Sequence, residues 1–245
     1  MRKVALWTLV VAFVLNAAMA LASSAGPGIT ADQVLQKLKD GNARFVAGKV
    51  QHPNEDAARR ADIAKNGQHP MVSVLSCSDS RVPPELLFDQ GFGDTFVIRV
   101  AGNVAATDEI ATIEYGTEHL GTPLVVVLGH SKCGAVTVVV KGDKVGGSLP
   151  TLVKPIVPAL NTVVKANPGA ERATLVDKTI TQNVWQAIED LYKKSPIVRE
   201  LALEGKVKVV GALYHLDSGQ VEFLGSHPNE AKLLAHKKGK RSKKH

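Results

Sequence analysis

Three residues whose side chains bind metal ions stand in two short motifs. Cys77 is in the first, and His130 and Cys133 form the second, with two residues between them. Two thiolates and one imidazole suit zinc, a borderline-soft ion with no geometric preference of its own. Three protein ligands would leave a fourth position for water, which is typical of a catalytic rather than a structural zinc site.

A carboxylate and a guanidinium follow the first cysteine, in Asp79 and Arg81. The planar fork of arginine matches a carboxylate in a two-bond pair. A carboxylate beside a metal could accept a hydrogen bond from bound water and orient that water. The alternative interpretation of Asp79 and Arg81 is an ordinary ion pair in a loop.

The chain has two cysteines, and both are in these motifs. In an exported protein, an even number of cysteines predicts a disulfide. A bond between Cys77 and Cys133 would remove two metal ligands. A non-catalytic zinc- or disulfide-stabilised protein that binds an anion or a partner is therefore the alternative to a metalloenzyme.

The elements that must position these residues are predicted to be strands of one α/β sheet. Continuously apolar strands alternating with helices indicate a parallel sheet with helices on both faces. We expect four parallel strands and one antiparallel edge strand, at residues 71–77, 95–100, 123–129, 207–214 and 220–224. Sites in such sheets form beyond the carboxyl ends of the strands, where Cys77 and His130 fall.

Helical signals surround these strands. Thr30 and Gln33 form a predicted capping box that opens an N-terminal helical arm, expected to pack on a partner subunit. Thr107 is predicted to cap a second helix, and a third should begin near Cys133. Residues 174–192 have apolar side chains at helical spacing, and the prolines of residues 150–158 predict a broken helix or loop.

The N-terminus has the pattern of a secretory signal peptide. Arg2 and Lys3 precede an apolar run, and small residues follow, with predicted cleavage near Ala20 or Ala22. The alternative is a retained membrane anchor. We predict a signal peptide over 1–22, a periplasmic or secreted protein, and no stable membrane anchor after cleavage. The mature part is expected to be a single domain over 23–235, with an arm and loop over 23–70 and an α/β core over 71–235.

The basic character of the chain is concentrated at its C-terminus. Of 245 residues, 30 are Lys or Arg and 23 are Asp or Glu, a net charge of +7. Residues 236–245 contain six Lys or Arg and no acidic residue, so the rest is nearly neutral. We therefore predict a disordered basic tail and no nucleic-acid partner. A specific polyanion-binding tail is the alternative.

The strings over residues 75–85 and 127–135 resemble the β-class carbonic anhydrases, and the resemblance extends from about residue 30 to about 225. It implies an enzyme that reversibly hydrates carbon dioxide to bicarbonate and a proton, through attack by zinc-bound hydroxide. It also implies one zinc per chain on Cys77, His130 and Cys133, with Asp79 and Arg81 as a catalytic pair. The implied assembly is a homodimer or dimer of dimers with the active site at the subunit interface.

The same resemblance suggests which residues bind substrate. Phe96 and Tyr115 match positions that shape the carbon dioxide pocket, with core packing as the alternative. Gln68 could form a hydrogen bond with substrate or product, or could be an exposed loop residue, and Gly134 is the fourth candidate substrate residue. Family members divide into a type whose aspartate can move onto zinc and an open type whose aspartate stays paired with arginine. Gln68 stands where the open type often has glutamine, so we predict that type.

One departure from the family pattern and two histidines also concern the expected chemistry. Val100 stands where the family commonly has asparagine, a departure that does not affect a ligand. His69 and His119 are candidate proton shuttles on pKa grounds alone.

Overall fold

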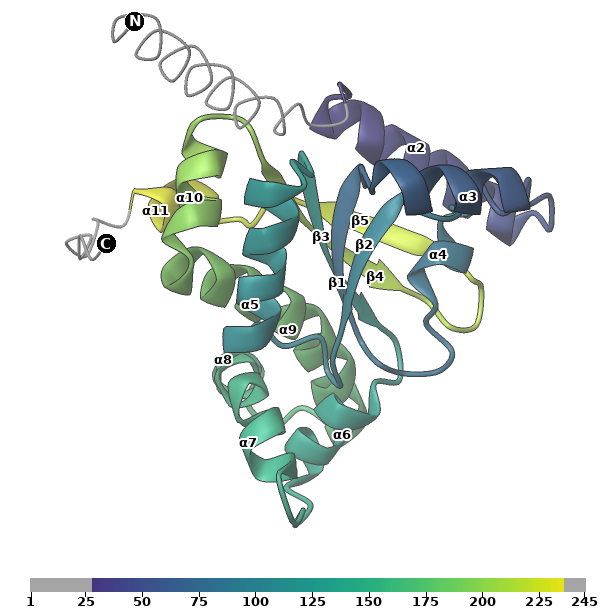
Figure 1. Cartoon of the computed structure of the whole chain (residues 1–245). Helices are drawn as coiled ribbons and strands as arrows, with labels where there is room; N and C mark the ends of the chain where they lie inside the picture. Colours follow the sequence, from purple (N-terminus) through teal and green to yellow (C-terminus); the bar gives the residue numbers. More distant parts are fainter. Residues whose placement is uncertain (1–27, 236–245) are drawn as a thin grey trace, which may run out of the picture.

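The computed structural model describes residues 28–235, which form a twisted sheet between two layers of helices (Figure 1). The predicted signal peptide and basic tail lie outside the described residues. The sheet has five strands in the order β2-β1-β3-β4-β5. These strands are β1 (Val72–Ser76), β2 (Thr95–Arg99), β3 (Leu124–His130), β4 (Lys208–Tyr214) and β5 (Val221–Gly225).

Four of the strands run parallel, and the fifth returns antiparallel at the edge. Strand β1 pairs in parallel with both β2 and β3, and β3 pairs in parallel with β4. Strand β5 pairs antiparallel with β4, with a bulge between Gly211 and Ala212. The predicted fold class, strand set and edge strand are confirmed.

Alternate side chains of the strands supply two separate cores. On one face, Leu75, Val125 and Val209 pack with residues of α5, α9, α10 and α11. On the other, Val74 and Val126 pack with residues of α2 and α4. Figure 1 shows these layers on opposite sides of the sheet. The bounds are α2 (Ala31–Val46), α4 (Pro84–Leu87), α5 (Thr107–Glu114), α9 (Arg172–Lys194), α10 (Pro196–Leu203) and α11 (Glu230–Leu234).

The N-terminal helix begins as its sequence predicts. The Thr30 hydroxyl accepts a hydrogen bond from the Gln33 amide, and the Gln33 side chain accepts one from the Thr30 amide, at 3.3 and 2.9 Å. This capping box opens α2. Val34 and Leu38 of α2 are fully buried against the chain's own sheet. Contact between α2 and a partner subunit stays a prediction.

The start of α5 corrects one expectation. Thr107 is the first helical residue, and Ala106 is the cap. The Glu109 carboxylate accepts the Ala106 amide hydrogen at 3.1 Å, so the helix start is held by a side chain that reaches back from its first turn, and the cap residue itself offers no side-chain acceptor. The helix continues into a π-helical turn, Tyr115–His119.

Short helices fill the connection between β3 and α9. They are α6 (Gly134–Lys141), α7 (Leu149–Val153) and α8 (Val157–Ala166), with a 3₁₀ turn, Lys154–Ile156, before α8. The predicted break at the prolines is confirmed. A further helix, α3 (Ala57–Asn66), precedes β1. Within residues 28–235, no helix has the length and apolar character needed to cross a membrane.

Candidate metal centre

The three predicted metal ligands converge at the carboxyl ends of two neighbouring strands. Cys77 directly follows β1, His130 is the last residue of β3, and Cys133 is the N-cap of α6. The register that pairs Ser76 with Leu128 brings these strand ends together. One ligand atom from each residue lies within 4.8 Å of the other two, and all three residues are buried. This cluster could hold a metal ion.

The His130 ring is oriented with one nitrogen free for a metal. Its Nδ1 is 2.9 Å from the Ser131 carbonyl oxygen, which accepts a hydrogen bond and so requires the proton on Nδ1. Its Nε2 is fully buried and has no hydrogen-bond partner among the described residues. A buried nitrogen without a partner is costly, and a metal would satisfy its lone pair. The donor set therefore fits zinc.

Both cysteines are free thiols in the structure, not a disulfide. A hydrogen bond from the Cys133 thiol lowers the pKa of Cys77 well below its usual range. The same contact, together with burial, raises the pKa of Cys133. The Gly102 amide also donates to Cys77 Sγ at 3.3 Å. Without metal, the pair therefore favours one proton shared between two sulfurs.

The pair formed by Asp79 and Arg81 lies beside this cluster. Arg81 Nε and Nη2 donate to the two carboxylate oxygens of Asp79 at 2.9 and 2.7 Å. These bonds hold the pKa of Asp79 well below its ordinary value. Asp79 Oδ2 is also 4.0 Å from His130 Nε2. An ionised carboxylate thus stands at the open side of the cluster.

Sequence reasoning missed Arg99, which fastens the loop between Cys77 and Asp79. Its Nε donates to the Cys77 carbonyl oxygen at 3.1 Å, and its Nη2 donates to the Asp79 carbonyl oxygen at 2.7 Å. One guanidinium therefore fixes both ends of the three-residue loop that presents a ligand and a carboxylate. A charged residue closing an otherwise apolar strand was the available signal.

Three of the predicted substrate residues lie at the other end of the sheet from the cluster of their own chain. Phe96 is in register with Ser73, near the start of β1, so about 13 Å of strand separates it from Cys77. Tyr115 packs against Phe96 with ring centroids 6.0 Å apart. Gln68 is exposed in the loop before β1. Phe96 and Tyr115 therefore form a pair away from the predicted metal ligands, and Gln68 lies in the loop at the same end of β1.

The remaining predicted residues divide between the two ends. Gly134 follows Cys133 as the first residue of α6, so it borders the cluster. The rings of His119 and Tyr115 are tilted against each other with centroids 5.2 Å apart, and exposed His69 follows Gln68 in the chain, so both histidines lie toward the end of the sheet that holds Phe96. Val100 packs its side chain among apolar residues and makes its hydrogen bonds through the backbone. Its replacement of asparagine therefore leaves no unpaired polar group.

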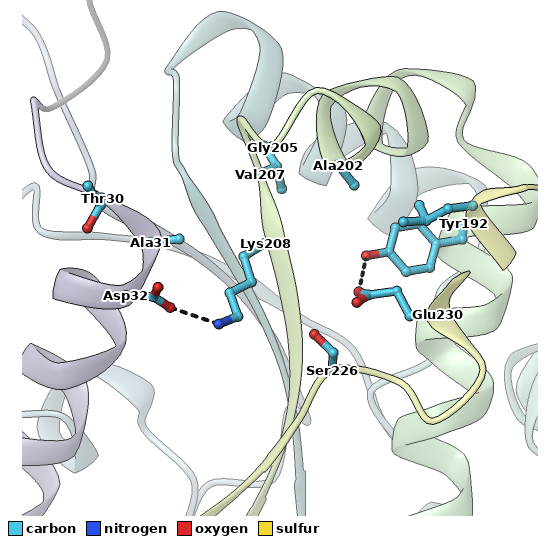
Figure 2. Close-up of a pocket in the computed structure, with 11 residues that line it drawn as sticks. Thr30, Ala31, Asp32, Tyr192, Ala202, Gly205, Val207, Lys208, Ser226 and Glu230 are labelled. Carbon is cyan, nitrogen blue, oxygen red and sulfur yellow. Dashed lines mark hydrogen bonds and ion pairs between the residues drawn. The ribbon is translucent and has the colours of Figure 1, made fainter. Parts of the chain in front are cut away.

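A separate hollow of about 360 Å³ also lies far from the cluster (Figure 2). It is next to Lys208, the first residue of β4, whereas His130 is level with the last residue of that strand. Lys208 pairs with Asp32 at 2.8 Å, and Tyr192 donates to Glu230 at 2.8 Å. These lining groups are already paired with one another, so the hollow is not part of the candidate metal centre.

The fold and the converging ligands define an α/β protein with a candidate metal centre beyond the ends of its parallel strands. A family model for carbonic anhydrase matches residues 72–221. A carbonic anhydrase of Mycolicibacterium smegmatis is 41% identical over 190 residues, covering 76% of this chain and 89% of that protein. Carbonic anhydrase 2 of Mycobacterium tuberculosis is 38% identical over 187 residues, covering 75% and 87% respectively.

A solved structure is also similar. The β-carbonic anhydrase CafA of Aspergillus fumigatus superposes with a TM-score of 0.65 at 28% identity, covering 82% of this chain and 93% of that one. The chain belongs to the carbonic anhydrase family, in its β class, and it is an enzyme of that class.

Proposed function

We propose that this chain catalyses the zinc-dependent, reversible hydration of carbon dioxide to bicarbonate and a proton. The observation that supports this most directly is the convergence of two thiols and one unpartnered imidazole nitrogen on a single point. Cys77, His130 and Cys133 would hold one zinc per chain. When bound, zinc supplies a Lewis acid that makes hydroxide available near neutral pH.

The Asp79 carboxylate orients the nucleophile in this proposal. Two thiolates would cancel the +2 charge of a bound zinc, and zinc held in this way would acidify water less than zinc held by three neutral imidazoles. Orientation of the nucleophile would then matter more, and the Asp79 carboxylate would supply it by accepting the hydrogen bond of the nucleophile's O–H group. Arg81 holds Asp79 through both carboxylate oxygens, which prevents free rotation of that group.

The same pairing favours the open type of site. Asp79 is engaged by Arg81, and its near oxygen stays 4.0 Å from His130 Nε2. Moving the carboxylate onto the metal would break a two-bond ion pair. We therefore propose that Asp79 remains at the rim of the site throughout turnover. Abrupt, cooperative loss of activity below about pH 8 would contradict this, since it would indicate that the carboxylate moves onto the metal as the pH falls.

The substrate pocket is proposed to be completed by a second subunit. About 13 Å of strand separates Phe96 from Cys77 of its own chain, Tyr115 packs on Phe96, and Gln68 precedes β1 at the same end of the sheet. Strand β2 is at the edge of the sheet, so its outer side is unpaired among the described residues. A homodimer that places this group of one chain beside the metal ligands of the other would assemble the apolar pocket. Gly134 would border it from the metal side.

A non-catalytic protein on the same fold is the alternative. It would require a bond between Cys77 and Cys133 or a site that only binds bicarbonate. The free thiols argue against the first version, and a carbon dioxide hydration assay tests the second. Zinc analysis combined with thiol titration distinguishes the zinc enzyme from the non-catalytic protein. About one zinc per chain supports the enzyme, while absence of both metal and free thiols would overturn it.

We also propose that the mature enzyme acts in the periplasm or outside the cell, on the strength of the N-terminal sequence pattern. Cell fractionation tests this placement. Recovery of a shortened chain from the periplasm is expected, and recovery of the full-length chain from the cytoplasm would contradict it.

A further inference from the structure

A buried amide on α9, the longest helix within residues 28–235, contacts the backbone of the candidate metal centre. Asn183 of α9 is 2% exposed. Its Nδ2 donates to the Gly102 carbonyl oxygen at 2.7 Å. Gly102 in turn donates its amide hydrogen to Cys77 Sγ at 3.3 Å. Two consecutive hydrogen bonds therefore connect α9 with a predicted zinc ligand.

The turn that contains Gly102 has little freedom of its own. The Asn103 amide donates to the Val100 carbonyl at 3.0 Å, which closes the turn. Gly102 has a φ of +77°, and a Cβ there would lie 2.9 Å from Ile156 Cδ1 and 3.1 Å from Ala135 Cβ. The turn is thus packed on one side and bonded to Asn183 on another, so its amide points in a fixed direction.

Helix α9 is itself held close to the other strand that carries a ligand. A Cβ at Gly129, the residue before His130, would lie 2.6 Å from Val184 Cγ2. Val184 is the residue after Asn183. The same segment of α9 therefore contacts the chain on both sides of the cluster, which gives the Asn183 amide a rigid base.

We propose that Asn183 is a positioning residue for the Cys77 thiolate, because it fixes the Gly102 turn and keeps the Gly102 amide hydrogen on Cys77 Sγ. This inference rests on the proposed zinc site. An N–H donor withdraws electron density from a thiolate and orients the sulfur. With two thiolates on one zinc, such a donor partly restores the positive charge that acidifies water. Asn183 would act through Gly102 and would not touch substrate.

The test compares Asn183→Leu and Asn183→Ala with a matched control, Thr179→Val, in the full mature chain. Leucine keeps the branched outline of asparagine without its donor, and alanine removes both. Thr179 is on the same helix, is fully buried, and has a hydroxyl without a partner among the described residues. Valine therefore keeps its shape and removes no hydrogen bond. Circular dichroism and thermal unfolding identify the variants that are folded.

Two readouts besides activity are measured on the folded variants. Zinc affinity is determined by competition with a chelator, and the cobalt-substituted protein gives the energy of the thiolate-to-cobalt absorption. We expect the Asn183 variants to bind zinc roughly 10- to 100-fold more weakly and to shift the cobalt band, with the control unchanged. A folded Asn183 variant with wild-type affinity and spectrum would overturn the proposal, as would an equal loss in Thr179→Val.

Hydrogen exchange of the wild-type protein gives a readout that needs no variant. Strong protection of the Gly102 amide is expected if it stays bonded to sulfur, and rapid exchange would overturn the proposal. Failure of the zinc site itself is distinguishable from both results. In that case the wild-type chain would bind no zinc, and its cobalt form would show no thiolate band.

Discussion

The carboxylate of Asp79 lies 4.0 Å from the imidazole of His130, measured from Oδ2 to Nε2. The same oxygen accepts a hydrogen bond from Arg81 at 2.7 Å. Asp79 is therefore close enough to influence a group bound at His130, while Arg81 keeps it from taking that place.

Replacing Arg81 tests this relationship. In Arg81→Ala, we expect kcat to fall by about 10- to 100-fold, because Asp79 loses both of its fixing bonds. Arg172→Ala is a suitable control, since Arg172 is an exposed residue at the start of α9. Stopped-flow assays at neutral pH compare the two variants. Wild-type turnover in Arg81→Ala would show that Asp79 needs no partner.

The same variant should change the dependence of stability on pH. Arg81 lowers the pKa of Asp79 in the folded chain, so the ionised pair stabilises the fold above the unfolded pKa of about 3.9. That stabilisation is lost as the pH falls through the folded pKa. Arg81→Ala should therefore lose less stability than wild type between about pH 4 and pH 2. Denaturant unfolding at several pH values measures this, and parallel curves would contradict it.

Removing the metal should make the two cysteines oxidisable. The sulfur atoms of Cys77 and Cys133 lie within 4.8 Å of each other, and zinc would occupy both. We expect chelator-stripped protein treated with oxidised glutathione to form a disulfide through a mixed-disulfide intermediate, with loss of zinc rebinding. The zinc-loaded protein should resist. Mass spectrometry and thiol counting follow the reaction, and equal oxidation of both forms would argue against ligation by both sulfurs.

A methyl group at Gly102 should disturb the site through the backbone. The positive φ and the close approach of Ile156 and Ala135 predict that Gly102→Ala loses about 2–4 kcal/mol of unfolding free energy. Gly146→Ala is the control, since a Cβ there meets no atom within 4 Å, and its change should stay within about 0.5 kcal/mol. Denaturant unfolding compares them, and equal stability of the two variants would refute this account of the turn.

Mixed dimers test whether two subunits share each pocket. Cys77→Ser should lack zinc, and Phe96→Ala should lack part of the pocket. If the two sets of residues meet across an interface, random mixing of the two variants gives heterodimers that each have one intact site. Equal mixing should then recover about a quarter of wild-type activity from two inactive parents. No recovery, after native mass spectrometry has shown that heterodimers form, would place the pocket within one chain.

Most of the fold could be predicted from the sequence because its strands are continuous apolar runs. Such runs leave little ambiguity about which segments are buried, and their chain order fixes the parallel crossovers. The metal cluster was predictable for the same reason, since Cys77 and His130 directly end two of these runs. The cap of α5 was not, because the cap residue is Ala106, which has no capping side chain, and the helix start is held instead by Glu109 reaching back to the Ala106 amide.

Residues that act through the backbone were harder to predict. Arg99 and Asn183 bond to carbonyl oxygens, and no side-chain pattern marks a carbonyl as a partner. The separation of Phe96 from Cys77 was also hidden, because a motif records order along the chain and not which end of a strand a residue occupies. Only the register of β1 and β2 places them apart.

The central claim is that Cys77, His130 and Cys133 hold a zinc ion that hydrates carbon dioxide. The most direct measurement is a carbon dioxide hydration assay on the mature protein, with zinc content determined on the same sample and Cys77→Ser as the comparison. We predict about one zinc per chain with rapid hydration in the wild type, and loss of both zinc and activity in Cys77→Ser. Equal activity in the two proteins would contradict it.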